Sequence, residues 1–77
     1  MEDPNRQFKR LSSVVRGYLD DQSCDWINQA YRFAFQAYEG QLRDSGGPYI
    51  IHPLATAEYL AKMQMDTAMI VAALLHD

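Results

Sequence analysis

The sequence predicts an all-α fold of about four helices. Apolar side chains recur at steps of three and four residues in four segments, and no stretch alternates apolar and polar residues over the length of a useful strand. Hydrophobic residues make up 48% of the chain and charged residues 22%, which is typical of a globular protein and excludes wholesale disorder. The 77 residues suffice for one small domain with a single core.

The first two predicted helices each carry one apolar stripe. The first spans about residues 5–19, and the second ends near Glu39 and Gly40. Between them the polar run DDQSCD interrupts the pattern, and Ser23 or Asp25 is predicted to cap the second helix. The stripes consist of Phe8, Leu11, Val15, Tyr18 and Leu19 in the first helix and of Ile27, Ala30, Tyr31, Ala34, Ala37 and Tyr38 in the second.

A loop is predicted over residues 39–49, where three glycines and a proline disfavour regular structure. Pro53 fits the first turn of a third helix, because that turn does not need the N–H that proline lacks. Asp66 or Thr67 is predicted to cap a fourth helix that is apolar almost all round. Such a helix needs neighbours on every side, so we expect the isolated chain to be loose or oligomeric. Because no helix-ending residue follows, we expect the sequence to stop within this helix.

Composition narrows the class of protein. A single cysteine, Cys24, forms no internal disulfide, and no basic and then apolar leader opens the chain, so we expect a cytoplasmic protein. The longest apolar run, residues 68–75, has eight members, whereas a membrane span needs roughly 20. Net charge is −3, and four of the seven basic residues lie in the first sixteen positions. That cluster predicts a solvated helix face, and no direct nucleic-acid partner is expected.

The two histidines of the chain are candidate metal ligands. His76 and Asp77 offer an imidazole nitrogen and a carboxylate oxygen, which zinc, manganese or iron accept. His52 lies 76 − 52 = 24 residues upstream at the start of the preceding helix, and an antiparallel helix pair brings that start beside the end of the next helix. The alternative is that the three residues are unrelated. His52 is then a helix cap or a surface ring before Pro53, and His76-Asp77 is a common dipeptide. Spacing alone leaves both interpretations open.

Two longer motifs lie in the stretch AYEGQLRDSGGPYIIHPLATAEYLAKMQMDTAMIVAALLHD, a GQ.R.SG.PY..HP loop and an AALLHD helix. Over about residues 25–77 the chain resembles the start of the RelA/SpoT-type alarmone hydrolase domain, a helical member of the HD metal-dependent phosphohydrolase superfamily. The resemblance implies an N-terminal helix and linker over residues 1–24, and the N-terminal part of an HD hydrolase domain over residues 25–77, truncated at the His-Asp motif. It implies an enzyme that removes the 3′-pyrophosphate from guanosine tetraphosphate or pentaphosphate, (p)ppGpp, and so ends the stringent response.

The resemblance also implies roles for single residues. His52, His76 and Asp77 match three of the family's four metal ligands, and the implied cofactor is a divalent metal, usually Mn²⁺. Arg43 and Ser45 match residues that line the nucleotide pocket, where the guanidinium can stack on guanine and the hydroxyl can hydrogen-bond the nucleotide. The fourth ligand and the Glu-Asp pair that helps to activate water in the family have no counterpart in the chain. No catalytic residue is therefore assigned, and we expect these 77 residues alone to be inactive.

Two positions depart from the family pattern. Asp44 stands where lysine is usual, which reverses a charge beside the expected polyanion and should weaken binding. Tyr38 stands where histidine is common, which is expected to affect loop packing. The intact His-Asp pair favours a hydrolase-competent parent protein, with or without a synthetase domain after the hydrolase domain. The rest of that parent chain is an expected partner of these 77 residues. The alternatives are a catalytically silent nucleotide-binding or regulatory domain, a purely structural helical piece, and a hydrolase of another phosphoester.

Overall fold

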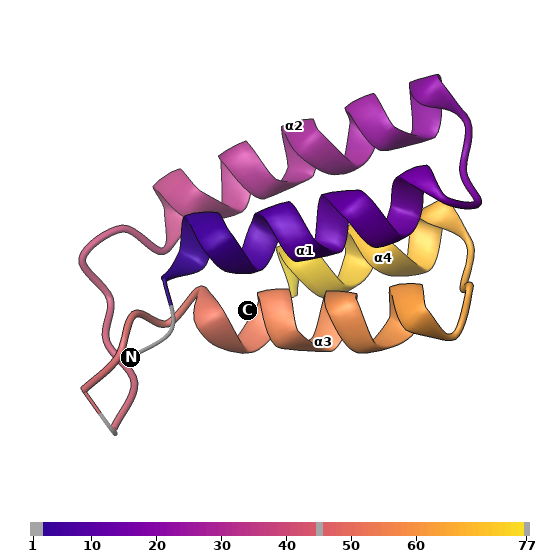
Figure 1. The fold of residues 1–77 in the computed structure, drawn as a ribbon. Helices are drawn as coiled ribbons and strands as arrows, with labels where there is room; N and C mark the ends of the chain where they lie inside the picture. Colours follow the sequence, from indigo (N-terminus) through magenta and orange to yellow (C-terminus); the bar gives the residue numbers. More distant parts are fainter. Residues whose placement is uncertain (1–2, 45, 77) are drawn as a thin grey trace.

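The computed structural model describes residues 3–44 and 46–76, and these residues form four α-helices (Figure 1). The helices are α1 (Pro4–Arg16), α2 (Asp21–Ala37), α3 (Ile51–Lys62) and α4 (Thr67–Leu75). The only extended pairing within the described ranges is one isolated bridge between Leu42 and Pro48. The all-α prediction is therefore confirmed.

Each helix packs against two of the others, so that the four surround one core. α1 lies against α2 and α3, and α4 lies against the same two helices from the other side (Figure 1). The largest fully buried side chains come from all four helices and are Leu11, Val15, Ile27, Leu54, Ile70 and Leu74. Burial of a side chain of this kind contributes roughly 1.5–3 kcal/mol relative to its exposure. The predicted apolar stripes thus meet in a single core.

Three of the helices begin at an aspartate whose side chain accepts a main-chain hydrogen bond. Asp3 accepts from the N–H of Asn5 over 3.0 Å, and Asp66 accepts from the N–H of Met69 over 2.9 Å. Asp20 accepts from the N–H of Ser23 over 2.8 Å. The expected cap at Asp66 is confirmed, whereas the expected cap at Ser23 or Asp25 is wrong. Ser23 lies inside the first turn and donates to the cap instead of providing it.

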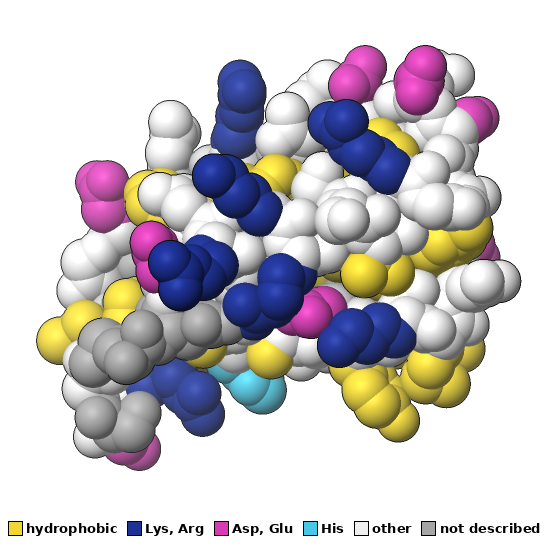
Figure 2. All heavy atoms as spheres, in the orientation of Figure 1, with side chains coloured by type: hydrophobic (Ala, Val, Ile, Leu, Met, Phe, Trp, Pro, Cys, Tyr) yellow, Lys and Arg dark blue, Asp and Glu magenta, His cyan; other side chains and the backbone are white. Residues whose placement is uncertain are grey.

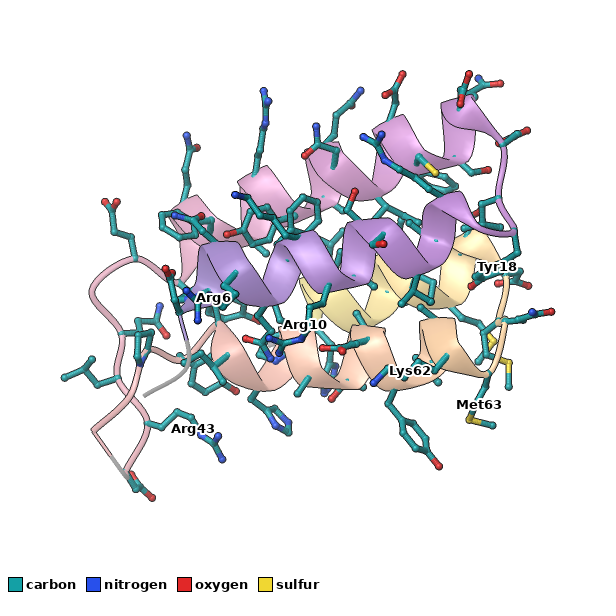
Figure 3. All side chains as sticks on the ribbon, in the orientation of Figure 1. Arg6, Arg10, Tyr18, Arg43, Lys62 and Met63 are labelled. Carbon is teal, nitrogen blue, oxygen red and sulfur yellow. The ribbon has the colours of Figure 1, made fainter. Side chains whose placement is uncertain are left out.

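The first helix ends at Arg16, three residues before its predicted end. Asp20 caps α2, so the chain must reverse direction over the residues between these two helices. In that turn the N–H groups of Tyr18 and Leu19 both donate to the carbonyl of Val15. The Tyr18 hydroxyl donates to the main-chain carbonyl of Met65 over 2.6 Å, which ties this turn to the turn between α3 and α4. Figure 3 shows Tyr18 at this end of the bundle.

The surface carries two contrasting regions. Figure 2 shows Lys and Arg side chains spread over the face that has α1 at its centre. On this face Arg10 Nε and Lys62 Nζ lie 3.4 Å and 3.3 Å from the same oxygen, Glu58 Oε2, which joins α1 to α3. Exposed ion pairs of this kind contribute about 0–1 kcal/mol each. Elsewhere, Met69 and Leu75 of α4 are 43% and 44% exposed, because α2 and α3 cover only part of this helix. This incomplete cover agrees with the argument that the other three helices cannot surround α4; whether the isolated chain is loose or oligomeric stays a prediction.

No helix in the described part of the chain is long and apolar enough to cross a membrane.

Candidate metal and nucleotide site

The loop between α2 and α3 folds back on itself in two paired arms. Tyr49 N–H donates to the carbonyl of Gln41 over 3.0 Å, and Arg43 N–H donates to the carbonyl of Gly47 over 2.8 Å. The φ angles of Gly40 and Gly46 are +81° and +94°, a backbone region that side chains disfavour, so these two glycines allow the bends. The prediction of a loop is confirmed, and its two arms give it a more definite shape than the sequence indicated.

Arg43 lies at the end of one arm of this loop. Its N–H is held by Gly47 and its carbonyl accepts from the N–H of Gly46 over 2.8 Å, so the backbone of Arg43 is fixed on both sides. Its side chain is exposed and extends from the loop at the end of the bundle where α3 begins (Figure 3). The neighbouring Asp44 is also exposed, and Leu42, Arg43, Asp44 and Tyr49 line a shallow open hollow. Ser45, the second predicted nucleotide-binding residue, lies outside the described residues.

His52 lies in the first turn of α3, directly after the loop. Its N–H donates to the carbonyl of Tyr49 over 3.1 Å, and its carbonyl accepts from the Thr56 hydroxyl over 3.2 Å. The next residue, Pro53, is buried and lies in the first helical turn, as predicted. The imidazole of His52 is exposed, and neither ring nitrogen has a hydrogen bond within residues 3–44 and 46–76. The helix start thus fixes the backbone and leaves the ring nitrogens available.

His76 follows the last residue of α4 and has an extended backbone, with φ −73° and ψ 122°. Its imidazole is exposed and has no hydrogen bond to any other described side chain or main chain. α4 runs antiparallel to α3 and points toward the end of the bundle where α3 begins, although it ends partway along α3 (Figure 1). The antiparallel direction that the spacing argument requires is therefore present, and a shared site of the two histidines stays a prediction. Asp77, the third predicted ligand, lies outside the described residues.

The donor set of these residues fits a divalent metal in type. Two imidazoles can supply nitrogen ligands, and exposed rings without hydrogen-bond partners need not break a protein contact to bind an ion. Within the described residues, no three His, Cys, Asp or Glu side chains form a group that can hold a metal. The predicted site accordingly combines two described histidines with Asp77.

Two residues make contacts near this site that the sequence did not predict: Tyr38, which was expected only to affect loop packing, and Gln7, for which nothing was predicted. The Tyr38 hydroxyl donates to the main-chain carbonyl of His76 over 2.5 Å, and Gln7 Nε2 donates to the carbonyl of Ile51, next to His52, over 3.1 Å. Both contacts join segments far apart in the chain, which local spacing does not reveal. For Gln7 a signal existed, because it lies one helical turn before Leu11 and therefore on the same face of the helix as this stripe residue.

Comparison with known proteins places these features in a family of enzymes. A guanosine-3′,5′-bis(diphosphate) 3′-pyrophosphohydrolase of Vibrio cholerae is 47% identical over 70 residues, which is 91% of this chain and 10% of that protein. The bifunctional (p)ppGpp synthase/hydrolase SpoT of Escherichia coli is 46% identical over the same shares of the two chains. The bifunctional (p)ppGpp synthase/hydrolase RelA of Mycobacterium tuberculosis is 57% identical over 73 residues, 95% of this chain and 10% of that protein.

These relatives confirm the resemblance to RelA/SpoT-type proteins, although the chain spans only about a tenth of their length. Residues 30–77 match the family model described as HD domain. The matched range begins within α2 and includes the loop, α3, α4 and both histidines. Since it covers more than half of the sequence, the chain belongs to the HD domain family.

Proposed function

We propose that this chain is the N-terminal part of an enzyme that removes the 3′-pyrophosphate from (p)ppGpp with the help of a divalent metal. The observation that carries the proposal is the 46–57% identity to proteins named as (p)ppGpp hydrolases or synthase/hydrolases. Hydrolases of the HD domain family depend on a divalent metal. We further propose that residues 25–77 begin the hydrolase domain, that the metal is Mn²⁺ and that the reaction takes place in the cytoplasm.

The proposed metal ligands are His52, His76 and Asp77. When bound, the ion lowers the pKa of its water and offsets the charge of the diphosphate. The backbone of His52 is held by α3 and by the loop in front of it, whereas His76 directly follows the last residue of α4 with an extended backbone. The chain's own contribution is thus a scaffold of ligands, and we expect it alone to show no turnover.

Arg43 and Ser45 are the proposed nucleotide-binding residues. A planar guanidinium can stack on guanine and form two parallel hydrogen bonds with a phosphate, which a lysine cannot do. Because the backbone of Arg43 is already fixed by hydrogen bonds, less conformational entropy is lost when this residue binds a ligand. Asp44 beside it repels the phosphates, which should weaken the binding of a highly charged nucleotide.

A second candidate is a catalytically silent domain that binds the nucleotide without hydrolysing it. The exposed Asp44 beside Arg43 favours this candidate, because it lowers the positive charge where the substrate phosphates are expected. In either case the proposed partners are a guanine nucleotide and the remaining part of a longer chain, and we expect no direct nucleic-acid partner.

Hydrolysis by the full-length protein that contains this sequence separates the two candidates. Purified protein with Mn²⁺ is incubated with guanosine tetraphosphate, and pyrophosphate release is measured before and after His52→Ala. We expect release that depends on Mn²⁺ and that His52→Ala abolishes, with Tyr59→Phe on the exposed side of α3 as the matched control. Nucleotide binding without pyrophosphate release supports the silent domain, and release that survives His52→Ala contradicts the proposed ligand set.

A further inference from the structure

Tyr38 connects three parts of the candidate site. It follows the last residue of α2 and is 8% exposed, and its hydroxyl donates to the main-chain carbonyl of His76 over 2.5 Å. Its ring packs against that of Tyr49 in the loop, with ring centroids 4.9 Å apart and an angle of 37° between the planes. One buried side chain therefore contacts the end of α2, the arm of the loop that leads to His52, and the residue that follows α4.

We propose that Tyr38 is a positioning residue for the metal ligand His76, an inference that rests on the proposed metal site. His76 has an extended backbone outside α4, so the hydrogen-bond ladder of the helix does not fix its orientation. The bond from Tyr38 instead holds the main-chain carbonyl of His76. By restraining the backbone at this residue, it limits the directions in which the imidazole can leave the main chain.

The surroundings of Tyr38 suit this role. A buried aromatic ring has few rotamers available, so its hydroxyl occupies nearly one position, and contact with Tyr49 restricts the ring further. The His76 imidazole, in contrast, is exposed and has no hydrogen bond within the described residues. In metal sites, contacts behind the ligands hold them in the binding geometry, and loss of one such contact typically weakens metal binding about 10- to 100-fold.

The molecule contains a matched control for this bond. At the end of the bundle opposite to the start of α3, the Tyr18 hydroxyl donates to the main-chain carbonyl of Met65 over 2.6 Å (Figures 1 and 3). Tyr18→Phe and Tyr38→Phe each remove one hydroxyl that bonds to a main-chain carbonyl. Both variants should lower the melting temperature, but only Tyr38→Phe should change metal binding.

The test measures the dissociation constant for Mn²⁺ alone by the electron paramagnetic resonance signal of the free ion, in the full-length protein that contains this sequence and in both variants. We expect Tyr38→Phe to bind Mn²⁺ about tenfold more weakly than the wild type and Tyr18→Phe to bind it as the wild type does. Equal affinity of Tyr38→Phe and wild type overturns the role of Tyr38 but leaves the metal site in place. Equal weakening in both variants also overturns it, because the effect is then one of stability. Absence of Mn²⁺ binding by the wild type overturns the metal site and this inference together.

A measurement on the wild type keeps the test decisive if Tyr38→Phe does not fold. Because linked equilibria are reciprocal, a bond that favours metal binding is itself strengthened by the metal. Saturating Zn²⁺, which is diamagnetic, should therefore shift the ¹³Cζ resonance of Tyr38, which responds to hydrogen bonding of the hydroxyl, and should leave that of Tyr18 unchanged. An unchanged Tyr38 resonance in the metal-bound protein contradicts the proposal.

Discussion

Gln7 in α1 donates a hydrogen bond from Nε2 to the main-chain carbonyl of Ile51, the first residue of α3, over 3.1 Å. Gln7 is only 3% exposed, and its Oε1 has no hydrogen-bond partner in the described structure. One half of a buried amide is thus satisfied and the other is not. The satisfied half joins α1 to the turn that carries His52.

Truncation of Gln7 should destabilise the fold. Gln7→Ala removes the hydrogen bond and leaves a cavity, so we expect the free energy of unfolding to fall by about 1–3 kcal/mol in urea titrations followed by circular dichroism. Gln7→Met is the matched variant, because it keeps most of the volume and removes the unpartnered oxygen. It should lie within about 1 kcal/mol of the wild type. Equal stability of Gln7→Ala and wild type contradicts the importance of this contact.

Gln64 should be replaceable by glycine with a gain in stability. It follows α3 with φ 57°, a left-handed conformation that a residue with a Cβ adopts at a cost of about 1–2 kcal/mol. Glycine avoids that cost but loses more chain entropy on folding, so Gln64→Gly should add about 0.5–1 kcal/mol. The measurement is the melting temperature, with Gln64→Ala as a control that keeps the Cβ. A lower melting temperature for Gln64→Gly than for Gln64→Ala is the contrary result.

Acid should weaken the start of α2 through Asp20. Hydrogen bonds from the side chain and the main chain of Ser23 lower the pKa of Asp20 below its usual 3.8. Because the pKa is lower in the folded state, the stabilisation is present above the unfolded pKa and is lost as pH falls through the folded pKa. Asp20→Asn keeps a capping side chain without the titration, so its stability should depend less on pH below about 4. The measurement is the urea midpoint of each protein as a function of pH. If the two midpoints fall in parallel as the solution is acidified, the expectation is wrong.

Cys24 should react slowly with thiol reagents in the folded protein. Partial burial raises the pKa of this thiol above its usual 9.0, although the nearby Arg16 opposes the shift. The thiolate is the reactive form, so the folded chain presents little of it near neutral pH. We expect slower reaction with a disulfide reagent at pH 8 in buffer than in denaturing urea. Similar rates in the two conditions are not compatible with this account of burial.

Asp44→Lys should tighten nucleotide binding if the proposed function holds. The change replaces an exposed negative charge beside Arg43 with a positive one, so we expect the affinity for guanosine tetraphosphate to rise about 3- to 10-fold at low salt and the gain to shrink at high salt. Calorimetry at two salt concentrations measures both effects. Asp25→Lys, at an exposed position of α2 outside the loop, is the control for net charge. An equal gain in the control contradicts a local effect.

The sequence predicted the helices well because their periodicity is a local property. The apolar stripes around Leu11 and Ile27 became the buried faces of α1 and α2, and Pro53 marked the first turn of α3. The start of α2 was missed because the run DDQSCD offers several capping residues. The choice of Asp20 depends on where the preceding turn can close, which the bond from Tyr18 to Met65 influences from another part of the fold.

The residue types of the candidate site could be proposed from the sequence, but its supporting contacts could not. The motif spacing predicts His52 and His76 as ligands, and α4 runs antiparallel to α3, toward the end of the bundle where α3 begins. The contacts of Gln7 with Ile51 and of Tyr38 with His76 join segments 44 and 38 positions apart. Contacts of this kind depend on three-dimensional packing, so no local pattern contains them.

The pairing of the two loop arms has an evolutionary consequence. Arg43 and Tyr49 are held through main-chain N–H groups that donate to the carbonyls of Gly47 and Gln41, and such bonds do not depend on the identity of the side chains. Gly40 and Gly46 are constrained by their positive φ angles, whereas Asp44 is not. A lineage can therefore change the charge at position 44 by a single codon while the backbone pairing of the loop is kept, so the surface charge of the loop can diverge faster than the fold.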